Sequence, residues 1–82
     1  MNTVAIEQEL QDFIGTKVVR SGRNVAVDVP LVQSGLIDSL GLLQIVAYIE
    51  KTYAVDLTKT GGPEDFKTIS SLAAAVSRQL SA

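Results

Sequence analysis

The 82-residue chain contains no cysteine and no histidine. Without cysteine it can form neither a disulfide nor a thiolate metal site, and without histidine it lacks the commonest general base and metal ligand. Tryptophan is also absent, and aromatic residues make up only 5% of the chain. These absences argue against catalysis and against metal binding.

A strong charge of either sign is missing as well. Seven basic residues face nine acidic ones, which gives a net charge of −2 and no basic stripe to match a phosphate backbone. No apolar run reaches the roughly 18 residues of a membrane span. Residues 1–14 carry acids where a secretory signal would be basic and then apolar. We therefore expect no nucleic-acid or membrane partner and a cytoplasmic location.

Aliphatic side chains dominate what the chain does contain. Hydrophobic residues make up 46% of it, enough for one modest core in a domain of this length. We expect an all-α fold, a monomeric four-helix bundle with a short third helix, in one domain over residues 1–82. The expected elements are a helix over residues 3–19, a loop over 20–37, a helix over 38–53, a short helix over 63–67 and a helix over 68–80.

The first helix is predicted by apolar residues at helical spacing, and residues 21–24 (Ser-Gly-Arg-Asn) are expected to end it. The apolar positions of this stripe are Ile6, Leu10, Phe13 and Ile14. Valines then alternate over residues 25–29 as in a β-strand, but no other segment offers a partner strand. We expect an ordered loop there, anchored by Leu31 and Ile37.

The helix over residues 38–53 carries two apolar stripes. The first, suited to a core, consists of Leu42, Ile45, Val46, Ile49 and Tyr53. The second consists of Leu40, Leu43 and Ala47. At 100° per residue, Leu43 lies roughly 100° from Leu42 and 160° from Ile45, so one neighbouring helix could hardly bury both stripes. We expect a docking surface; the alternative is that Leu43 is one more core or boundary residue.

The last third of the chain contains two consecutive glycines followed by a proline, at residues 61–63. Residues 58–63 are expected to form a loop, with Pro63 in the first turn of the short helix. Thr68 is a suitable N-cap for the last helix. The predicted inward face of that helix consists of Ile69, Leu72, Ala73, Val76 and Leu80.

One short motif, Gly-Leu-Ile-Asp-Ser-Leu over residues 35–40, directly precedes the helix with two stripes. Taken alone, Asp38 and Ser39 are ordinary N-cap residues. Together with Val-Asp-Leu at residues 55–57 and Phe-Lys-Thr-Ile at residues 66–69, however, the motif resembles the acyl carrier proteins. The resemblance extends over nearly the full chain.

The resemblance implies a function for this motif. Ser39 would be esterified by 4′-phosphopantetheine, which a phosphopantetheinyl transferase takes from coenzyme A, and Asp38 would be read by that transferase. The thiol of the cofactor would hold an acyl or aminoacyl intermediate as a thioester, so the chain would be a non-catalytic carrier. A loading ligase or acyltransferase and downstream synthases would dock on the second helix. The residues expected to meet them are Leu40, Leu43, Gln44 and Ala47.

The chain departs from the familiar fatty-acid carriers in its second helix. Gly41 and Gln44 stand where acids are common in those carriers, and only Glu50 and, beyond the helix, Asp56 remain acidic. This departure favours a specialised pathway of polyketide or nonribosomal-peptide type over fatty-acid biosynthesis. By resemblance, Leu36, Ile37 and residues 55–66 would shelter the cargo.

Two other classes of protein stay open from the sequence. One is an adaptor with the carrier fold and no prosthetic group, in which Ser39 is only a cap and the second helix binds a permanent partner. The other is a small nucleic-acid-binding domain, for which Lys17, Arg20 and Arg23 form the single basic cluster. Those cations are explained more simply by the dipole of the first helix.

Overall fold

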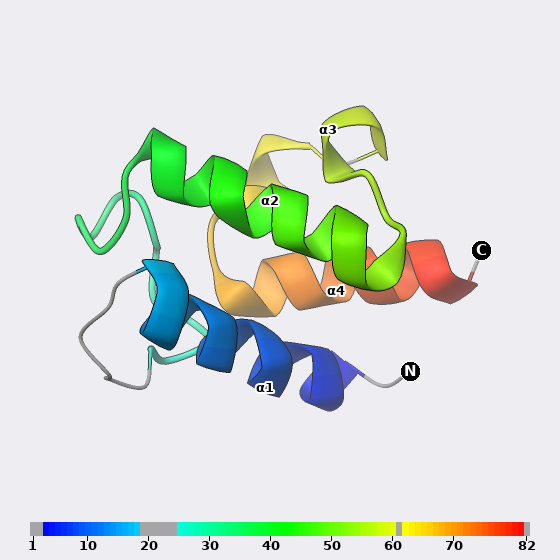
Figure 1. The fold of residues 1–82 in the computed structure, drawn as a ribbon, viewed down its shortest axis with the longest axis horizontal. Helices are drawn as coiled ribbons and strands as arrows, with labels where there is room; N and C mark the ends of the chain where they lie inside the picture. The colour runs from blue at the N-terminus through cyan, green and yellow to red at the C-terminus, as the bar shows by residue number, and fades with distance from the viewer. Residues whose placement is uncertain (1–2, 19–24, 61, 82) are drawn as a thin grey trace.

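A computed structural model describes residues 3–18, 25–60 and 62–81, and every regular element in these ranges is helical (Figure 1). The elements are α1 (Thr3–Phe13), a π-helical turn η1 (Ile14–Val18), α2 (Ser39–Tyr53), α3 (Leu57–Thr60), a 3₁₀ turn η2 (Pro63–Phe66) and α4 (Ile69–Ser81). The expected all-α fold with four helices is confirmed. None of the described helices has the length and apolar character needed to cross a bilayer.

The first helix packs mainly along α4, which runs in the opposite direction, so the start of α1 and the end of α4 lie on the same side of the molecule (Figure 1). Its contact face is the predicted stripe, because Ile6, Leu10 and Ile14 are fully buried. The helix widens into the π turn at Ile14, and Thr16 Oγ1 there donates to the carbonyl of Asp12 at 2.7 Å. The expected end of the helix at residues 21–24 lies outside the described residues.

Residues 25–38 form a sequence of turns, as expected, and no strand occurs in this described segment. Backbone hydrogen bonds attach it to the start of α4: the Leu31 N–H donates to Lys67 O and the Ser70 N–H to Val27 O, both at 2.8 Å. The predicted apolar anchors, Leu31 and Ile37, are both buried. The segment that leads into α2 is therefore held by the core as well as by the backbone of the last helix.

Two side-chain contacts join α2 to α1. The Tyr53 hydroxyl, at the last residue of α2, donates to the carboxylate of Glu9. One turn earlier, the rings of Phe13 and Tyr48 stack with centroids 4.0 Å apart and an angle of 14° between their planes. Together with buried Ile45, these contacts hold one side of α2 against the first helix.

The segment after α2 differs from the prediction of a loop over residues 58–63. The Asp56 side chain accepts the Thr58 N–H at 3.0 Å, and a turn of helix, α3, follows at once. Asp56 thus acts as an N-cap that the sequence analysis did not recognise. The expected short helix over residues 63–67 is present as the 3₁₀ turn η2, which ends at Phe66.

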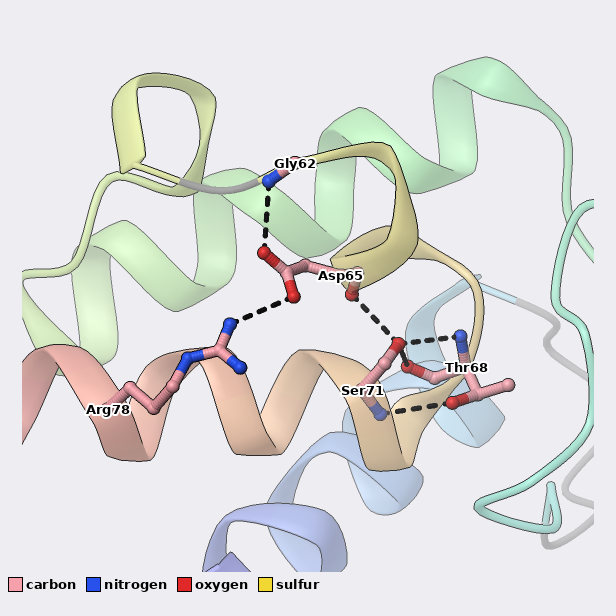
Figure 2. Close-up of polar contacts among 5 residues, drawn as sticks. All are labelled: Gly62, Asp65, Thr68, Ser71 and Arg78. Atoms are coloured by element: carbon pink, nitrogen blue, oxygen red, sulfur yellow. Dashed lines mark hydrogen bonds and ion pairs between the residues drawn. The ribbon is translucent and has the colours of Figure 1, made fainter.

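A polar network holds η2 against α4 (Figure 2). The Asp65 carboxylate accepts the Gly62 N–H and a guanidinium N–H of Arg78, both at 2.9 Å. Thr68 and Ser71 cap α4 reciprocally, since each side-chain oxygen accepts the other residue's N–H at 3.0 Å. The predicted cap at Thr68 is thereby confirmed, and the network stabilises the corner that receives the Leu31 hydrogen bond.

The inward face of α4 is mostly as predicted, because Ile69, Leu72, Ala73 and Val76 are fully buried. The prediction is wrong for Leu80, whose side chain is 43% exposed. Periodicity placed Leu80 on the correct face of the helix, but the last turn of α4 extends past the elements that cover that face (Figure 1). An apolar residue there is only partly covered.

Candidate functional site

Ser39 is the first residue of α2, and its side chain is exposed. The helix is capped by its neighbour: Asp38 has an extended backbone, and its Oδ1 accepts the Gly41 N–H at 2.8 Å. No hydrogen bond found within the described part of the chain uses the Ser39 hydroxyl. The sequence offered both Asp38 and Ser39 as the N-cap. In the structure the N-cap is Asp38. Ser39 lies at the N-terminus of the helix with its side chain exposed to solvent.

The first turn of α2 is pressed against the end of the first helix at Gly41. A β-carbon at this position would lie 3.0 Å from Val18 Cγ1 and 3.2 Å from Ile37 Cβ. Glycine inside a helix costs roughly 0.5–1 kcal/mol relative to alanine, so its presence calls for a close approach of this kind. Comparison with the fatty-acid carriers marks Gly41 only as a position where an acid is missing. The usable signal was a glycine in the first turn of an otherwise strong helix.

The second apolar stripe of α2 is exposed. Leu40 and Leu43 expose 65% and 60% of their side chains, and Gln44 and Ala47 are exposed beside them. We call these four residues the exposed face of α2. The alternative that Leu43 belongs to the core is therefore wrong. The first stripe faces inward, with Ile45, Val46, Ile49 and Tyr53 buried and Leu42 half-buried against the core.

A hollow of about 590 Å³ opens between the end of the first helix and the start of α2. Its volume lies within the roughly 300–1,000 Å³ typical of small-molecule sites. The residues around it are Lys17, Val18, Gly35, Leu36, Ile37, Asp38, Leu40, Gly41 and Gln44. Ser39 itself does not line the hollow, but Asp38 and Leu40, its two neighbours in the chain, both do.

A second, smaller pocket of about 240 Å³ lies between the loop, α2 and η2. It is lined by Pro30, Val32, Gln33, Leu42, Phe66 and Lys67. The residues expected by resemblance to shelter a cargo are thus separated in the structure. Leu36 and Ile37 line the large hollow, Phe66 lines the small pocket, and Val55 and Leu57 are buried in the core.

The titratable groups with displaced pKa values lie away from Ser39. Burial, and then the hydrogen bond to Glu9, raises the pKa of Tyr53 well above its ordinary value. Tyr53 ends the helix that Ser39 begins, about 20 Å away along its axis. The Gly62 N–H, and then Arg78, lowers the pKa of Asp65 in η2. Across the described residues, no group of three or more carboxylate, histidine or cysteine side chains could hold a metal ion.

The residues around Ser39 fit a phosphopantetheine group. The serine oxygen is exposed and takes no part in the cap, so it can be esterified without loss of an internal hydrogen bond. It stands at the N-terminus of a 15-residue helix, where backbone N–H groups favour a phosphate. The hollow beside it offers room for part of the attached chain.

Comparison with known sequences agrees with this geometry. A search of curated proteins finds no match. The family described as "phosphopantetheine attachment site", whose members carry 4′-phosphopantetheine covalently, matches residues 4–76. Apart from Thr3 at the start of α1 and the last turns of α4, this range contains the described helices, and it includes Ser39 and all residues that line the hollow. The chain therefore belongs to the phosphopantetheine attachment-site family and is a carrier protein of the acyl carrier type.

Proposed function

We propose that Ser39 is the attachment site and that the chain carries acyl or aminoacyl groups as thioesters between enzymes. The observation that supports this assignment is that the N-cap of α2 is formed by Asp38 and not by Ser39. Asp38 caps the helix through Gly41 and leaves the hydroxyl of Ser39 exposed and unused. When bound, the group supplies a terminal thiol, which accounts for thioester chemistry in a chain without cysteine.

The chain itself takes a passive part in its own loading. In the reaction, the Ser39 oxygen forms a bond to the phosphorus of coenzyme A that carries pantetheine, and the pyrophosphate bond breaks. Adenosine 3′,5′-bisphosphate leaves, and the serine proton passes to a base of the transferase. No hydrogen bond found among the described residues joins the Ser39 hydroxyl to a side chain that could take its proton, and Asp38 serves as the helix cap through Oδ1. Activation is therefore assigned to the transferase, and the carrier is non-catalytic.

The exposed face of α2 is proposed as the docking site of the transferase, a loading ligase or acyltransferase, and downstream synthases. The only charged residues of α2 are Glu50 and Lys51, which offset each other. Electrostatic attraction is therefore weak, and contact with Leu40 and Leu43 dominates. The absence of a net charge on this docking helix favours a specialised pathway of polyketide or nonribosomal-peptide type over fatty-acid biosynthesis.

Intact-mass measurement tests the assignment of Ser39. The protein is incubated with coenzyme A, magnesium and a broad-specificity phosphopantetheinyl transferase, and we expect a gain of one phosphopantetheine. Ser39→Ala should gain nothing and should change the free energy of unfolding by no more than about 0.5 kcal/mol, because it removes neither a cap nor a buried group. Ser34→Ala, which alters another exposed serine in the loop that precedes α2, should load normally.

Two results would contradict the proposal. Loading of the Ser39→Ala variant would place the group on another residue. No loading of the unmodified protein by several transferases would favour the adaptor class, in which the exposed face of α2 binds a permanent partner.

A further inference from the structure

The hollow lined by Asp38 and Leu40, the two neighbours of Ser39 in the chain, has walls of mixed chemistry. Lys17, from the π turn, supplies a positive charge, and Gln44, one turn into α2, supplies an amide. The apolar part of the wall comes from Val18, Leu36, Ile37 and Leu40. Phosphopantetheine has the matching sequence of groups: a singly charged phosphodiester, a carbon with two methyl groups, and then two amides.

We propose that this hollow receives the first part of the phosphopantetheine arm, with Lys17 paired to the phosphodiester and Gln44 hydrogen-bonded to the pantetheine chain. The proposal rests on Ser39 as the attachment site and adds a resting place for the arm on the carrier. Lys17 is a positioning residue here, because it acts on the arm and takes no part in the transfer.

The charges around the hollow explain why a cation is needed. Lys17 and Asp38 are the two charged residues that line it. A phosphodiester on Ser39 would place a second negative charge next to Asp38, and Lys17 offsets this repulsion. Charges that share one hollow are screened by salt only over separations longer than the Debye length, which is about 10 Å at 0.1 M ionic strength.

The smaller pocket across α2 suits the arm less well. It is less than half the size of the hollow, and neither neighbour of Ser39 lines it. Its cation, Lys67, is already paired with Glu64 at 3.2 Å, whereas neither ion pair found among the described residues involves Lys17. The first part of the arm is therefore assigned to the hollow.

Nuclear magnetic resonance of the loaded protein tests the proposal directly. Loading is verified first by intact mass, so a failure to load counts against Ser39 and not against the hollow. In the loaded protein, we expect nuclear Overhauser effects between the methyl groups of the arm and the methyl groups of Val18 and Leu36. Shift changes relative to the unloaded protein should include Lys17 and the side-chain amide of Gln44.

Charge variants at Lys17 test whether its charge holds the arm in the hollow or whether the arm only lies near it. Lys17→Glu should remove these Overhauser effects, and Lys17→Arg should retain them. Lys51→Glu is the matched control, because it makes the same charge change on an exposed residue near the far end of α2 and should leave them intact. Salt at 1 M, where the Debye length is about 3 Å, should weaken them in the unmodified protein.

Three outcomes would overturn the proposal. In the first, the loaded protein shows no Overhauser effects from the arm, and its shift changes are confined to residues 38–40. In the second, the contacts go to Leu42 and Phe66 in the smaller pocket. In the third, Lys17→Glu folds, loads and keeps the contacts of the arm unchanged, which would remove the ion pair from the assignment.

Discussion

The side chain of Val18 packs over Gly41, with its Cγ1 atom 3.0 Å from the point that a β-carbon on residue 41 would occupy. Carbon atoms in favourable contact lie about 3.5–4.0 Å apart, so a side chain at residue 41 would push the π turn away from α2. Ile37 Cβ, at 3.2 Å from the same point, blocks relaxation on the loop side. The glycine is what allows the helix that begins at Ser39 to lie against two core elements.

Gly41→Ala is therefore expected to destabilise the protein. In an open helix this change stabilises by roughly 0.5–1 kcal/mol, so a loss of stability would reverse the usual sign. Urea unfolding measures it. Combining the change with Val18→Ala supplies the control, because a double-mutant cycle should show that the penalty depends on Val18. A gain of stability from Gly41→Ala alone would mean that the contact relaxes freely.

Substitutions at Asp38 can separate its cap from its proposed recognition by the transferase. Asp38→Ala should lower the free energy of unfolding by about 0.5–2 kcal/mol, because the Gly41 N–H loses its partner. Asparagine is an equally good N-cap, so Asp38→Asn should retain most of that stability. If the carboxylate is read by the transferase, both variants should have a lower kcat/KM for loading. Normal loading of Asp38→Asn would leave the residue with its capping role alone.

Leu43→Asp is expected to impair docking without affecting the fold. The side chain is 60% exposed, so the free energy of unfolding should change by no more than about 0.5 kcal/mol. Loss of a central apolar contact of about 1–2 kcal/mol should lower the kcat/KM of loading roughly 5- to 30-fold. Thr52→Asp, on an exposed position at the other end of α2, is the control for charge alone. Unfolding of Leu43→Asp would show that the residue supports the core.

The contact between Tyr53 and Glu9 predicts a dependence of stability on alkaline pH. Burial, and then the hydrogen bond to Glu9, raises the pKa of Tyr53, so the folded state retains its proton after an unfolded chain has begun to lose it. The contribution is complete below the unfolded tyrosine pKa of about 10 and is lost as the pH rises beyond it.

Tyr53→Phe tests this prediction. It should lower the free energy of unfolding by about 0.5–1.5 kcal/mol at neutral pH, because Glu9 is exposed and water can replace the hydroxyl. It should also reduce the loss of stability above pH 10, measured by urea unfolding over a pH series. Tyr48→Phe, which retains the ring stacked on Phe13, should keep the alkaline loss. An unchanged alkaline profile in Tyr53→Phe would contradict the assignment to Tyr53.

Periodicity was a reliable guide where one helix packs along another. Ile6, Leu10 and Ile14 are fully buried, and so are Ile45 and Ile49, each on the predicted face. The same argument separated Leu40 and Leu43 from the core, since a single neighbour cannot cover two stripes that diverge by 100° or more. The start of α2 at Ser39 was also readable, because Asp-Ser before an apolar helix is a strong N-terminal signal.

The two wrong predictions concern α3 and Leu80, where the structure depends on contacts that a local sequence pattern does not show. The sequence does not predict α3, because a helix of four residues has too few positions to show a period. The cap at Asp56 is visible only through its hydrogen bond to Thr58. Leu80 was assigned to the core because periodicity identifies a face of one helix but not how far its neighbours extend along it.

By itself, the sequence determined the helical class, the inward faces of the long helices and the identity of the serine at the head of α2. These depend on residues close together in the chain, through the helical repeat and the chemistry of an N-cap. Tertiary structure alone decided which residue caps α2, why residue 41 must be glycine and that one hollow is lined by Lys17 together with Asp38 and Leu40, the neighbours of Ser39. The cap, the glycine and the hollow all depend on how the π turn, the loop and α2 pack against one another. Spacing along the sequence does not give the distances between these segments in space.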